Sequence, residues 1–466
     1  MSHEEASEKM IEDGGEYSAE IGDMALPSGQ GVARLGGLVV FVPGTVPGDR
    51  VRLKVVRLER RFAYGELLRM EEESPLRERP QCPHVGRCGG CGLQALSYEG
   101  QLKVKENHLR QVLKRIGGED LEGVEVSTIV PSVDRFFYRG KIEFSFGYAG
   151  PPASASRVIV GLRGHASPLH PEANRVVPVD GCPLFSPAAS VALPPVRELI
   201  DGSGLAPYDP ATGKGTLKRL VLREAKGTGE LMVHLIAASD ISRHLAGLRE
   251  RLPRALPRLR SIYATEGAGP RLLWGKPAID ELLSGLLLRV YPLSFLQPNP
   301  RTAERLYERI KAVAGITGGE RVLGLYCGAG SIELFLGRYV KEVVGIDSSG
   351  ESIACARENA VLNKSGNCLF LEEKAERAAR RLRPGKVDLL VVDPPRKGMT
   401  GQTLAAVNEI RPERMIYVSC NPSTLARDLK ELRRTYRAGT IIPFDFFPHT
   451  AHFEVLTLLE RTGPAR

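Results

Sequence analysis

The chain has 466 residues, of which 42% are hydrophobic and 26% charged, a composition that is ordinary for a globular protein and excludes wholesale disorder. No apolar run approaches the roughly 18 residues of a membrane helix, and the N-terminus lacks the basic and apolar regions of a signal peptide. The net charge is +9, but residues 1–23 carry −7, so the other 443 residues carry +16. We therefore expect a cytoplasmic protein of about three domains with a polyanionic partner such as nucleic acid and no membrane partner.

The N-terminal part divides into an acidic tail and a small barrel. Residues 1–15 are poor in apolar side chains, which predicts disorder. Residues 16–72 contain short apolar alternations separated by Gly-Gly and Pro-Gly turns, typical of an OB-like β-barrel of about five strands. Its cations and neighbouring aromatic residues suit phosphate and base binding, although charges that protect an edge strand are an equally good explanation. These residues are Arg50, Arg52, Lys54, Arg57, Arg60, Arg61, Phe62 and Tyr64.

Residues 73–290 are expected to form a central α+β domain. Residues 98–115 have helical spacing, and their polar face carries Lys103, Lys105, Arg110, Lys114 and Arg115. From residue 126 onward, strand-like runs predict a mainly antiparallel sheet interrupted by a helix at 241–252. The runs are 141–148, 157–162, 217–224, 230–237 and 260–266.

Four cysteines precede the last third of the chain: Cys82, Cys88 and Cys91 in a cluster, and Cys182 alone. In a chain of this size they do not resemble a disulfide framework, so we expect reduced thiols and a metal site. Four thiolates suit zinc or an iron–sulfur cluster, and the spacing alone does not distinguish the two.

Residues 291–466 alternate between helical and strand-like segments, which predicts a Rossmann-like, doubly wound parallel sheet. Two late strands follow the last helix too closely for another crossover, so we expect them to pair antiparallel at the edge. The strand candidates are 321–325, 342–347, 387–393, 415–419, about 440–446 and 452–460.

The first two of these strands end in features of a nucleotide-type cofactor site. The first runs into Gly328-Ala-Gly330, a tight turn at which backbone can approach a ligand closely. The second ends at Asp347, about where an acid accepts hydrogen bonds from ribose hydroxyls, although Asp347 could instead cap the next helix. Together with the terminal antiparallel pair, this pattern resembles the S-adenosylmethionine-dependent methyltransferases.

The third and fourth strands end in reactive groups. Asp393 is followed by Pro-Pro-Arg396, a rigid wall at the carboxyl edge of the sheet. Methyltransferases that act on exocyclic amines commonly have an aromatic residue at the position of Arg396, so another acceptor atom is indicated. Cys420 stands at the tip of the fourth strand, just before a helix whose dipole is expected to lower the pKa of the thiol.

Three motifs together resemble the RNA uracil-5-methyltransferase family. They are Val392-Asp-Pro-Pro-Arg-Lys-Gly398, Ser419-Cys-Asn-Pro422 and Phe447-Pro-His-Thr-Ala-His-Phe-Glu454. Phe295-Leu-Gln-Pro-Asn299 matches the start of that family's methyltransferase domain, and residues 16–72 are similar to a TRAM domain. The resemblance covers nearly the whole chain.

The resemblance implies transfer of a methyl group from S-adenosylmethionine to carbon-5 of a uridine in structured RNA. That carbon is too weakly nucleophilic to react unaided, so Cys420 would add to carbon-6 and Glu454 would remove the carbon-5 proton. Without its motif, Glu454 would simply be a carboxylate on a strand surface. Phe295 would stack on the flipped base. The cofactor site would be lined by Gln297, Tyr326, Gly328, Ser331, Asp347 and Asp393.

Two positions depart from the family pattern near the methionine end of the cofactor. Gly324 stands where many members have Asp, and Ser331 where the closest pattern often has Asn. Arg139 and Lys141 match a family pattern and would hold phosphate, with ion pairs that stabilise the fold as the equal alternative.

The resemblance also implies a four-iron, four-sulfur cluster on Cys82, Cys88, Cys91 and Cys182, with a structural or RNA-organising role. A barrel combined with such a cluster is most like the members that act on 23S ribosomal RNA, and transfer RNA is the alternative substrate. A non-catalytic RNA-binding assembly factor is the second class of function. We expect a monomer whose barrel grips RNA through Arg57, Arg60 and Arg61.

Overall fold

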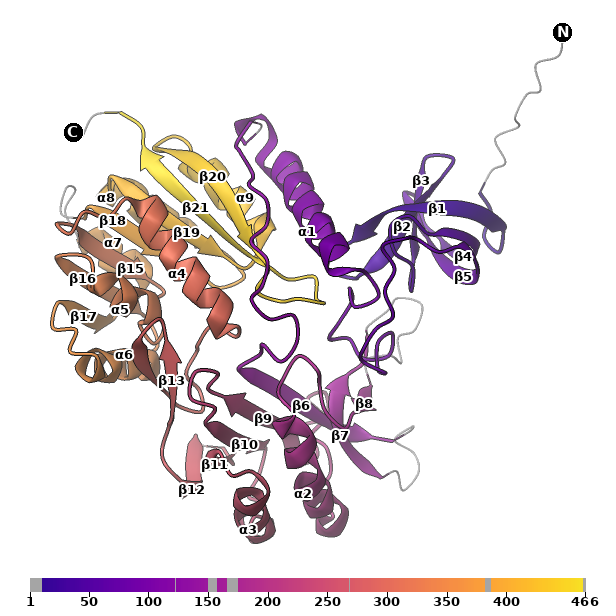
Figure 1. The fold of residues 1–466 in the computed structure, drawn as a ribbon, viewed down its shortest axis with the longest axis horizontal. Coiled ribbons are helices and arrows are strands. Elements are labelled where there is room, and N and C mark those ends of the chain that lie inside the picture. The colour runs from indigo at the N-terminus through magenta and orange to yellow at the C-terminus, as the bar shows by residue number, and fades with distance from the viewer. Residues whose placement is uncertain are drawn as a thin grey trace. The chain divides into compact units, whose positions relative to one another are not determined.

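The computed structural model describes residues 11–121, 123–149, 157–165, 175–267, 269–381 and 387–463 (Figure 1). The chain separates into two compact units. The first comprises Met1–His108, Arg163–Asn174 and Pro448–Ala451, and the second comprises the rest of the chain. Within the described ranges, no helix combines the length and the apolarity that crossing a bilayer requires.

The first unit contains the predicted five-stranded barrel. The strands close in the order β1-β2-β3-β5-β4, and every second side chain points inward, as the alternating apolar pattern requires. The interior is filled by small and branched side chains such as Val40, Val51 and Val55. The strands are β1 (Glu16–Ala25), β2 (Gln30–Leu35), β3 (Leu38–Val42), β4 (Arg50–Leu58) and β5 (Phe62–Glu72).

The chain joins the barrel earlier than the composition predicts. Ile11 packs against the barrel core. The Gly14 amide donates to the Val55 carbonyl at 2.8 Å, and the Val55 amide donates to the Gly15 carbonyl at 2.9 Å. The predicted disorder is therefore wrong for residues 11–15, because backbone pairing with β4 orders them despite their acidic side chains. Residues 1–10 lie outside the described ranges.

The helix predicted at 98–115 is present as α1 (Tyr98–Val112), which continues into a π-helical turn, Leu113–Gly117. One of its five cations departs from the prediction. Lys105 is fully buried, so it does not belong to a solvated basic face. The helical period places it on the apolar side, beside the turn that carries Leu109.

The second unit contains two seven-stranded sheets. The middle sheet has the order β12-β11-β10-β9-β6-β7-β8; its pairs are antiparallel from β7 through β6 and β9 to β10, and β10 and β11 run parallel. Helix α2 (Ala188–Ser203) packs on the same core as the sheet. Helix α2 was not predicted from the sequence, because it contains Pro194 and Pro195, which are unfavourable inside a helix. The other elements are β6 (Lys141–Tyr148), β7 (Val158–Arg163), β8 (Val176–Pro178), β9 (Leu217–Glu224), β10 (Leu231–Ala237), α3 (Ala246–Ala255), β11 (Leu259–Thr265) and β12 (Pro270–Gly275).

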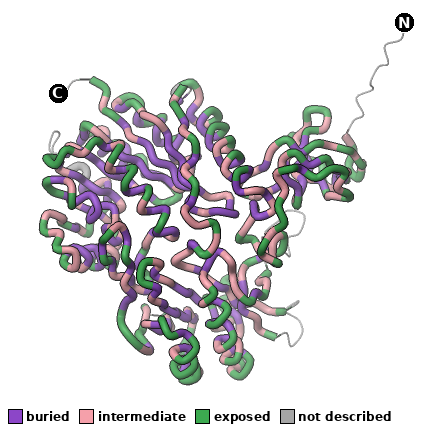
Figure 2. The backbone as a smooth tube through the Cα atoms, viewed as in Figure 1, coloured by how far each residue is buried: buried purple, intermediate pink, exposed green. Residues whose placement is uncertain are grey.

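The C-terminal sheet has the order β17-β16-β15-β18-β19-β21-β20. Its first five strands are parallel, and β21 pairs antiparallel with both β19 and β20, which confirms the expected doubly wound layout. Figure 2 shows its central strands as a buried layer. The strands are β15 (Arg321–Leu325), β16 (Glu342–Asp347), β17 (Cys368–Glu372), β18 (Leu389–Val392), β19 (Arg414–Ser419), β20 (Tyr436–Phe444) and β21 (Glu454–Arg461). The helices are α4 (Pro300–Ala314), α5 (Ser331–Gly337), α6 (Gly350–Leu362), α7 (Ala375–Arg381), α8 (Gly401–Ile410) and α9 (Pro422–Leu432).

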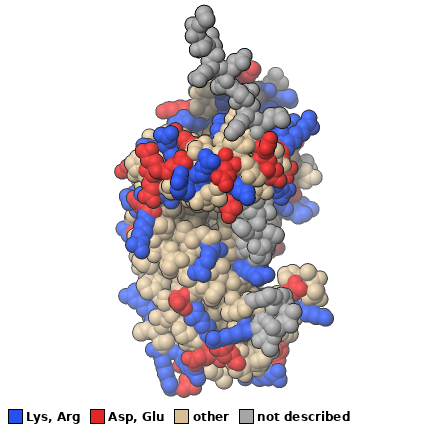
Figure 3. Space-filling model, turned by 90° about the vertical axis from the view of Figure 1, so that its right-hand side faces the viewer, with Lys and Arg blue, Asp and Glu red and all other residues tan. Residues whose placement is uncertain are grey.

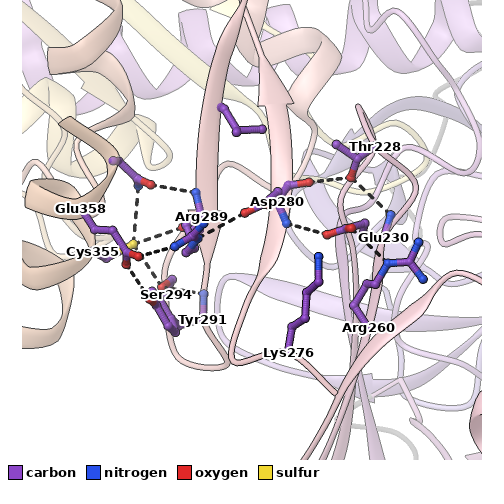
Figure 4. Close-up of polar contacts among 12 residues, drawn as sticks. Thr228, Glu230, Arg260, Lys276, Asp280, Arg289, Tyr291, Ser294, Cys355 and Glu358 are labelled. Carbon is purple, nitrogen blue, oxygen red and sulfur yellow. Dashed lines mark hydrogen bonds and ion pairs between the residues drawn. The ribbon is translucent and has the colours of Figure 1, made fainter. Parts of the chain in front are cut away.

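A hairpin, β13 (Ile279–Leu283) with β14 (Leu286–Val290), joins the two sheets of the second unit (Figure 4). On one side the Asp280 amide donates to Glu230 at 2.9 Å. On the other side Arg289 forms an ion pair with Glu358 of α6 at 2.5 Å, and Tyr291 donates to the same carboxylate. Leucines of the hairpin also belong to the core of the C-terminal sheet, so that core begins before residue 291, the expected boundary.

A second segment from the expected central domain also packs with the C-terminal sheet. The Ile441 amide donates to the Glu125 carbonyl at 2.8 Å, and the Asp445 amide donates to the Val130 carbonyl at 2.9 Å. Residues 125–130 therefore run alongside β20 in parallel. Sequence spacing could not reveal this pairing, because its partners lie more than 300 residues apart.

Candidate active site

The parallel strands of the C-terminal sheet bring the predicted site residues to one edge. Leu325 of β15 is paired with Ile346 of β16 on one side and with Val392 of β18 on the other. The residue that follows each of these three therefore lies at the carboxyl edge of the sheet. These residues are Tyr326, Asp347 and Asp393. The parallel pairing of β18 with β19 adds Cys420 to the same edge.

The Gly-Ala-Gly turn is held by the carboxylate at the end of β16. Asp347 accepts from the Gly328 amide at 3.0 Å and from the Ser349 amide at 2.9 Å. The cap of α6 is Ser349, whose side chain accepts from the Ser352 amide. Capping is therefore not the role of Asp347, which instead fixes the turn and keeps further lone pairs for a ligand. Gly330 has φ +80, and a Cβ there would lie 2.7 Å from the Phe370 ring, so the turn requires glycine.

Two other expected cofactor contacts have partners within the site. Gln297 Nε2 donates to Asp393 Oδ2 at 3.2 Å, and burial raises the pKa of Asp393 to about 7. The Ser331 hydroxyl lies 2.8 Å from that of Tyr307, a fully buried residue of α4. Tyr307 was not predicted from the sequence as a residue of this site.

The segment that carries Gln297 is anchored by Asn299. Its side chain caps α4 by accepting from the Thr302 amide at 3.2 Å. Its Nδ2 donates to the Phe446 carbonyl at 3.1 Å. The Phe295–Asn299 motif is therefore tied to the strand that leads into the last motif.

The middle of that last motif belongs to the first unit. The His449 amide donates to Gln101 Oε1 at 2.8 Å, and the Leu93 amide donates to the His449 carbonyl at 3.0 Å. These bonds hold the Pro448–Ala451 segment within the first unit.

Cys420 and Glu454 lie beside each other across an antiparallel pair. Ser419 of β19 is opposite Val455 of β21, so the next residues on the two strands, Cys420 and Glu454, face one another at the edge. Glu454 is only 5% exposed. Burial, reinforced by Asp393, holds the pKa of Glu454 well above its ordinary value.

The prediction that helix α9 lowers the pKa of Cys420 is wrong for the unliganded protein. Burial and the carboxylates of Glu454 and Asp393 raise the pKa of the thiol to about 11. The first two amides of α9 are not available to the thiol, because Pro422 has no amide hydrogen and the Ser423 amide donates to the Asn421 side chain at 3.0 Å.

Arg396 is a site residue whose role the sequence did not predict. Its guanidinium lowers the pKa of both Cys420 and Glu454, so its positive charge acts on the reactive pair. Its carbonyl accepts from Asn421 Nδ2 at 2.9 Å, which joins the Asp-Pro-Pro-Arg turn to the start of α9. The sequence offered one signal for such a role, because Arg396 stands where methyltransferases that act on exocyclic amines commonly have an aromatic residue.

The three residues of the second unit that were expected to contact RNA differ in their surroundings. Phe295 is 60% exposed and lies next to the Gly328 turn, 4.0 Å from the position of a Cβ there. Lys141 forms an ion pair with Glu143 at 2.6 Å, which supports the stabilising alternative for this residue. Arg139 stacks over the ring of Tyr138, 6.0 Å from its centroid.

The barrel surface carries both signs of charge (Figure 3). Arg50, Arg52 and Arg57 pair with Glu72, Glu16 and Glu59, respectively. Exposed pairs of this kind contribute little stability and exchange easily for phosphate. The aromatic residues form a cluster with ring centroids 5.6 to 5.8 Å apart, and the sequence analysis missed one member, Phe41. The cluster consists of Phe41, Phe62 and Tyr64.

The expected iron–sulfur cluster is not confirmed. Across the described ranges, no group of three or more His, Cys, Asp or Glu side chains is arranged to hold a metal ion. Cys82, Cys88 and Cys91 belong to the first unit, whereas Cys182 belongs to the second and packs against the core of the middle sheet.

Comparisons with known proteins match the chain along nearly all of its length. A family model described as tRNA (Uracil-5-)-methyltransferase matches residues 284–462, and the TRAM domain model matches residues 12–68. An uncharacterized RNA methyltransferase of Halalkalibacterium halodurans is 34% identical over 447 residues, which cover 93% of this chain and 94% of the relative. The chain belongs to the RNA uracil-5-methyltransferase family.

Two further matches agree with the assignment of this chain to the uracil-5-methyltransferase family. An uncharacterized RNA methyltransferase of Caldanaerobacter subterraneus is 34% identical over 460 residues, covering 96% of this chain and 98% of the relative. The crystal structure of Pyrococcus abyssi tRNA (uracil-54, C5)-methyltransferase in complex with S-adenosyl-L-homocysteine has 29% identity and a TM-score of 0.70, and covers 94% of this chain and 98% of that one. The family model begins inside the β13–β14 hairpin, in agreement with the packing of that hairpin on the C-terminal core.

Proposed function

We propose that the enzyme methylates carbon-5 of a uridine in structured RNA through a covalent adduct with Cys420. The observation that carries the proposal is the pairing of Cys420 with Glu454 at the sheet edge that also holds Asp347 and Asp393. A nucleophile and a base on the same side of one strand pair are what addition at carbon-6 and proton removal at carbon-5 require.

The chain's own residues divide the reaction between them. Cys420 releases its proton to solvent and the thiolate sulfur bonds to carbon-6 of the uracil, which places the electron pair of the carbon-5–carbon-6 double bond on the carbon-5 side and makes carbon-5 nucleophilic. When bound, S-adenosylmethionine supplies an electrophilic methyl group for carbon-5. The Glu454 carboxylate then takes the carbon-5 proton, the double bond re-forms and the Cys420 thiolate leaves. Arg396 stabilises the anionic forms of both residues, as the direction of its effect on their pKa values requires.

The cofactor is proposed to lie along the carboxyl ends of β15, β16 and β18. Asp347 retains lone pairs for ribose hydroxyls beside the Gly328 amide that it already holds. Gln297 orients Asp393. The acidic character of this edge suits a ligand with a sulfonium and an ammonium group. The remaining contacts proposed for this site are Tyr326, Gly328 and Ser331.

The RNA substrate is proposed to be 23S ribosomal RNA, held by the barrel and with Phe295 stacked on the flipped base. Arg57, Arg60, Arg61 and Arg139 are proposed phosphate contacts, whereas Lys141 retains its ion pair. Transfer RNA is the second candidate, favoured by the similarity to the Pyrococcus abyssi enzyme, a tRNA (uracil-54, C5)-methyltransferase. Methyl transfer to separate transcripts of the two RNAs distinguishes these substrates.

The experiment that tests the chemistry is a covalent trap. RNA with 5-fluorouridine at the target cannot lose its carbon-5 substituent as a proton, so the adduct persists. The wild-type enzyme with S-adenosylmethionine should give a denaturation-resistant complex, and Cys420→Ala should give none. Glu454→Gln should still form the complex, because addition precedes the step that needs the base. A non-catalytic RNA-binding protein would give no complex with any variant.

A further inference from the structure

A buried carboxylate beside the cofactor turn has no role in the reaction described above. Glu333 lies in the first turn of α5, two residues after Ser331, and is 3% exposed. Its side chain occupies the space next to Gly324 in β15. A Cβ built at Gly324 would collide with Glu333 Oε1 and would lie 2.9 Å from Glu333 Cδ. The carboxylate therefore takes the place that any side chain at position 324 would need.

The surroundings of Glu333 are acidic. Its charged neighbours at the sheet edge are Asp347 and Asp393, and both oppose its ionisation. Burial is the larger effect, and together they raise the pKa of Glu333 to about 8. Among the described residues, the charged groups that act on the pKa of Glu333 are thus two further carboxylates. Such a cluster is stable as anions only when a positive ligand joins it.

We propose that Glu333 binds the ammonium group of the methionine portion of S-adenosylmethionine, and that Gly324 is required because it leaves room for this carboxylate. The inference rests on the cofactor site proposed above. Asp347 is engaged with the turn that would face the ribose, and Asp393 lies one strand away. Glu333 packs against β15, the strand between those that carry Asp347 and Asp393. It is therefore the carboxylate available for the ammonium group of S-adenosylmethionine.

The arrangement accounts for the glycine at a position where many family members have Asp. In this chain the carboxylate comes from helix α5 instead of strand β15, and it reaches the same space from the opposite side. Restoring Asp at 324 with Glu333 present would place two carboxylates in a space that holds one. Restoring it with Glu333 shortened to Ser should return a single carboxylate to the site.

Calorimetric titration with two ligands tests the proposal. S-adenosylhomocysteine carries the ammonium group, whereas methylthioadenosine has the same purine and ribose without it. Glu333→Gln should weaken S-adenosylhomocysteine binding by about ten- to one-hundredfold, the usual cost of losing a charged hydrogen bond. It should leave methylthioadenosine binding unchanged, which also shows that the variant is folded. Gly324→Asp/Glu333→Ser should bind S-adenosylhomocysteine more tightly than Glu333→Ser alone.

Proton release gives an independent readout. With a pKa of about 8, Glu333 is mostly protonated at pH 7, so an incoming ammonium group should displace about one proton that Glu333→Gln no longer releases. The difference between the two proteins is the quantity to measure, because it isolates Glu333 from the ionisable groups that interact with it electrostatically. They are Asp347, Asp393, Tyr307, Cys327 and Cys368.

The two proposals fail in different ways. If the wild-type protein binds S-adenosylhomocysteine and Glu333→Gln binds it equally well with equal proton release, the role of Glu333 is wrong and the cofactor site stands. If the wild-type protein binds neither ligand, both proposals are wrong.

Discussion

The resting state of Cys420 yields a quantitative prediction about its reactivity. With a pKa of about 11, about one thiol in a thousand is ionised at pH 8, against about one in ten for a thiol with an ordinary pKa of 9. The ionised fraction of Cys420 is thus about one hundredth of that of the ordinary thiol. A more basic thiolate is also more nucleophilic, which raises the reaction rate of the ionised form by about six- to tenfold. Iodoacetamide should therefore alkylate Cys420 about ten to fifteen times more slowly than an ordinary thiol at pH 8.

The assay follows alkylation of the tryptic peptide Met415–Arg427, in which Cys420 is the only cysteine. The rate should keep rising as the pH increases through 10. Arg396→Ala should slow the reaction further, because its guanidinium lowers the pKa of the thiol. Lys397→Ala is the matched control, an exposed neighbouring cation without that influence. A rate that reaches its plateau below pH 8 would show that the helix dipole dominates and that the reasoning is wrong.

Three further predictions concern other parts of the chain. Asp49→Ala should destabilise the barrel by about 3 kcal/mol in urea unfolding, because its buried carboxylate joins the Val46 amide to Arg77; the exposed Glu71→Ala should cost far less. Asn421→Ala should lower stability by about 1 kcal/mol by removing the α9 cap. Phe295→Ala should weaken RNA binding by about five- to one-hundredfold through lost base stacking, with S-adenosylhomocysteine affinity unchanged in calorimetry.

The doubly wound sheet was predictable because its signals are local. Each of the four predicted parallel strands, β15, β16, β18 and β19, is an apolar run that leads into Gly, Asp or Cys, and chain order places those ends on one edge. The barrel was predictable for the same reason, since turns and alternation mark each strand. The edge strand β17 was missed because its outer side chains, such as Leu369, are exposed and its pattern is short.

The features that were not predicted from the sequence depend on contacts between distant segments or on burial. The pairing of residues 125–130 with β20 leaves no local trace. Lys105 was expected on a polar face because of its charge, and it is fully buried. The pKa of Cys420 reverses the prediction because burial and two carboxylates outweigh one helix end, and their positions are known only once β18, β19 and β21 are assembled.

The central claim, methylation at carbon-5 through Cys420, is tested most directly with RNA labelled with tritium at carbon-5 of uridine. Incubation with S-adenosylmethionine should release one tritium to water for every methyl group transferred, because the carbon-5 hydrogen leaves through Glu454. Cys420→Ala should release no tritium and transfer no methyl group. Methyl transfer without tritium release, or undiminished turnover by Cys420→Ala, would contradict the account.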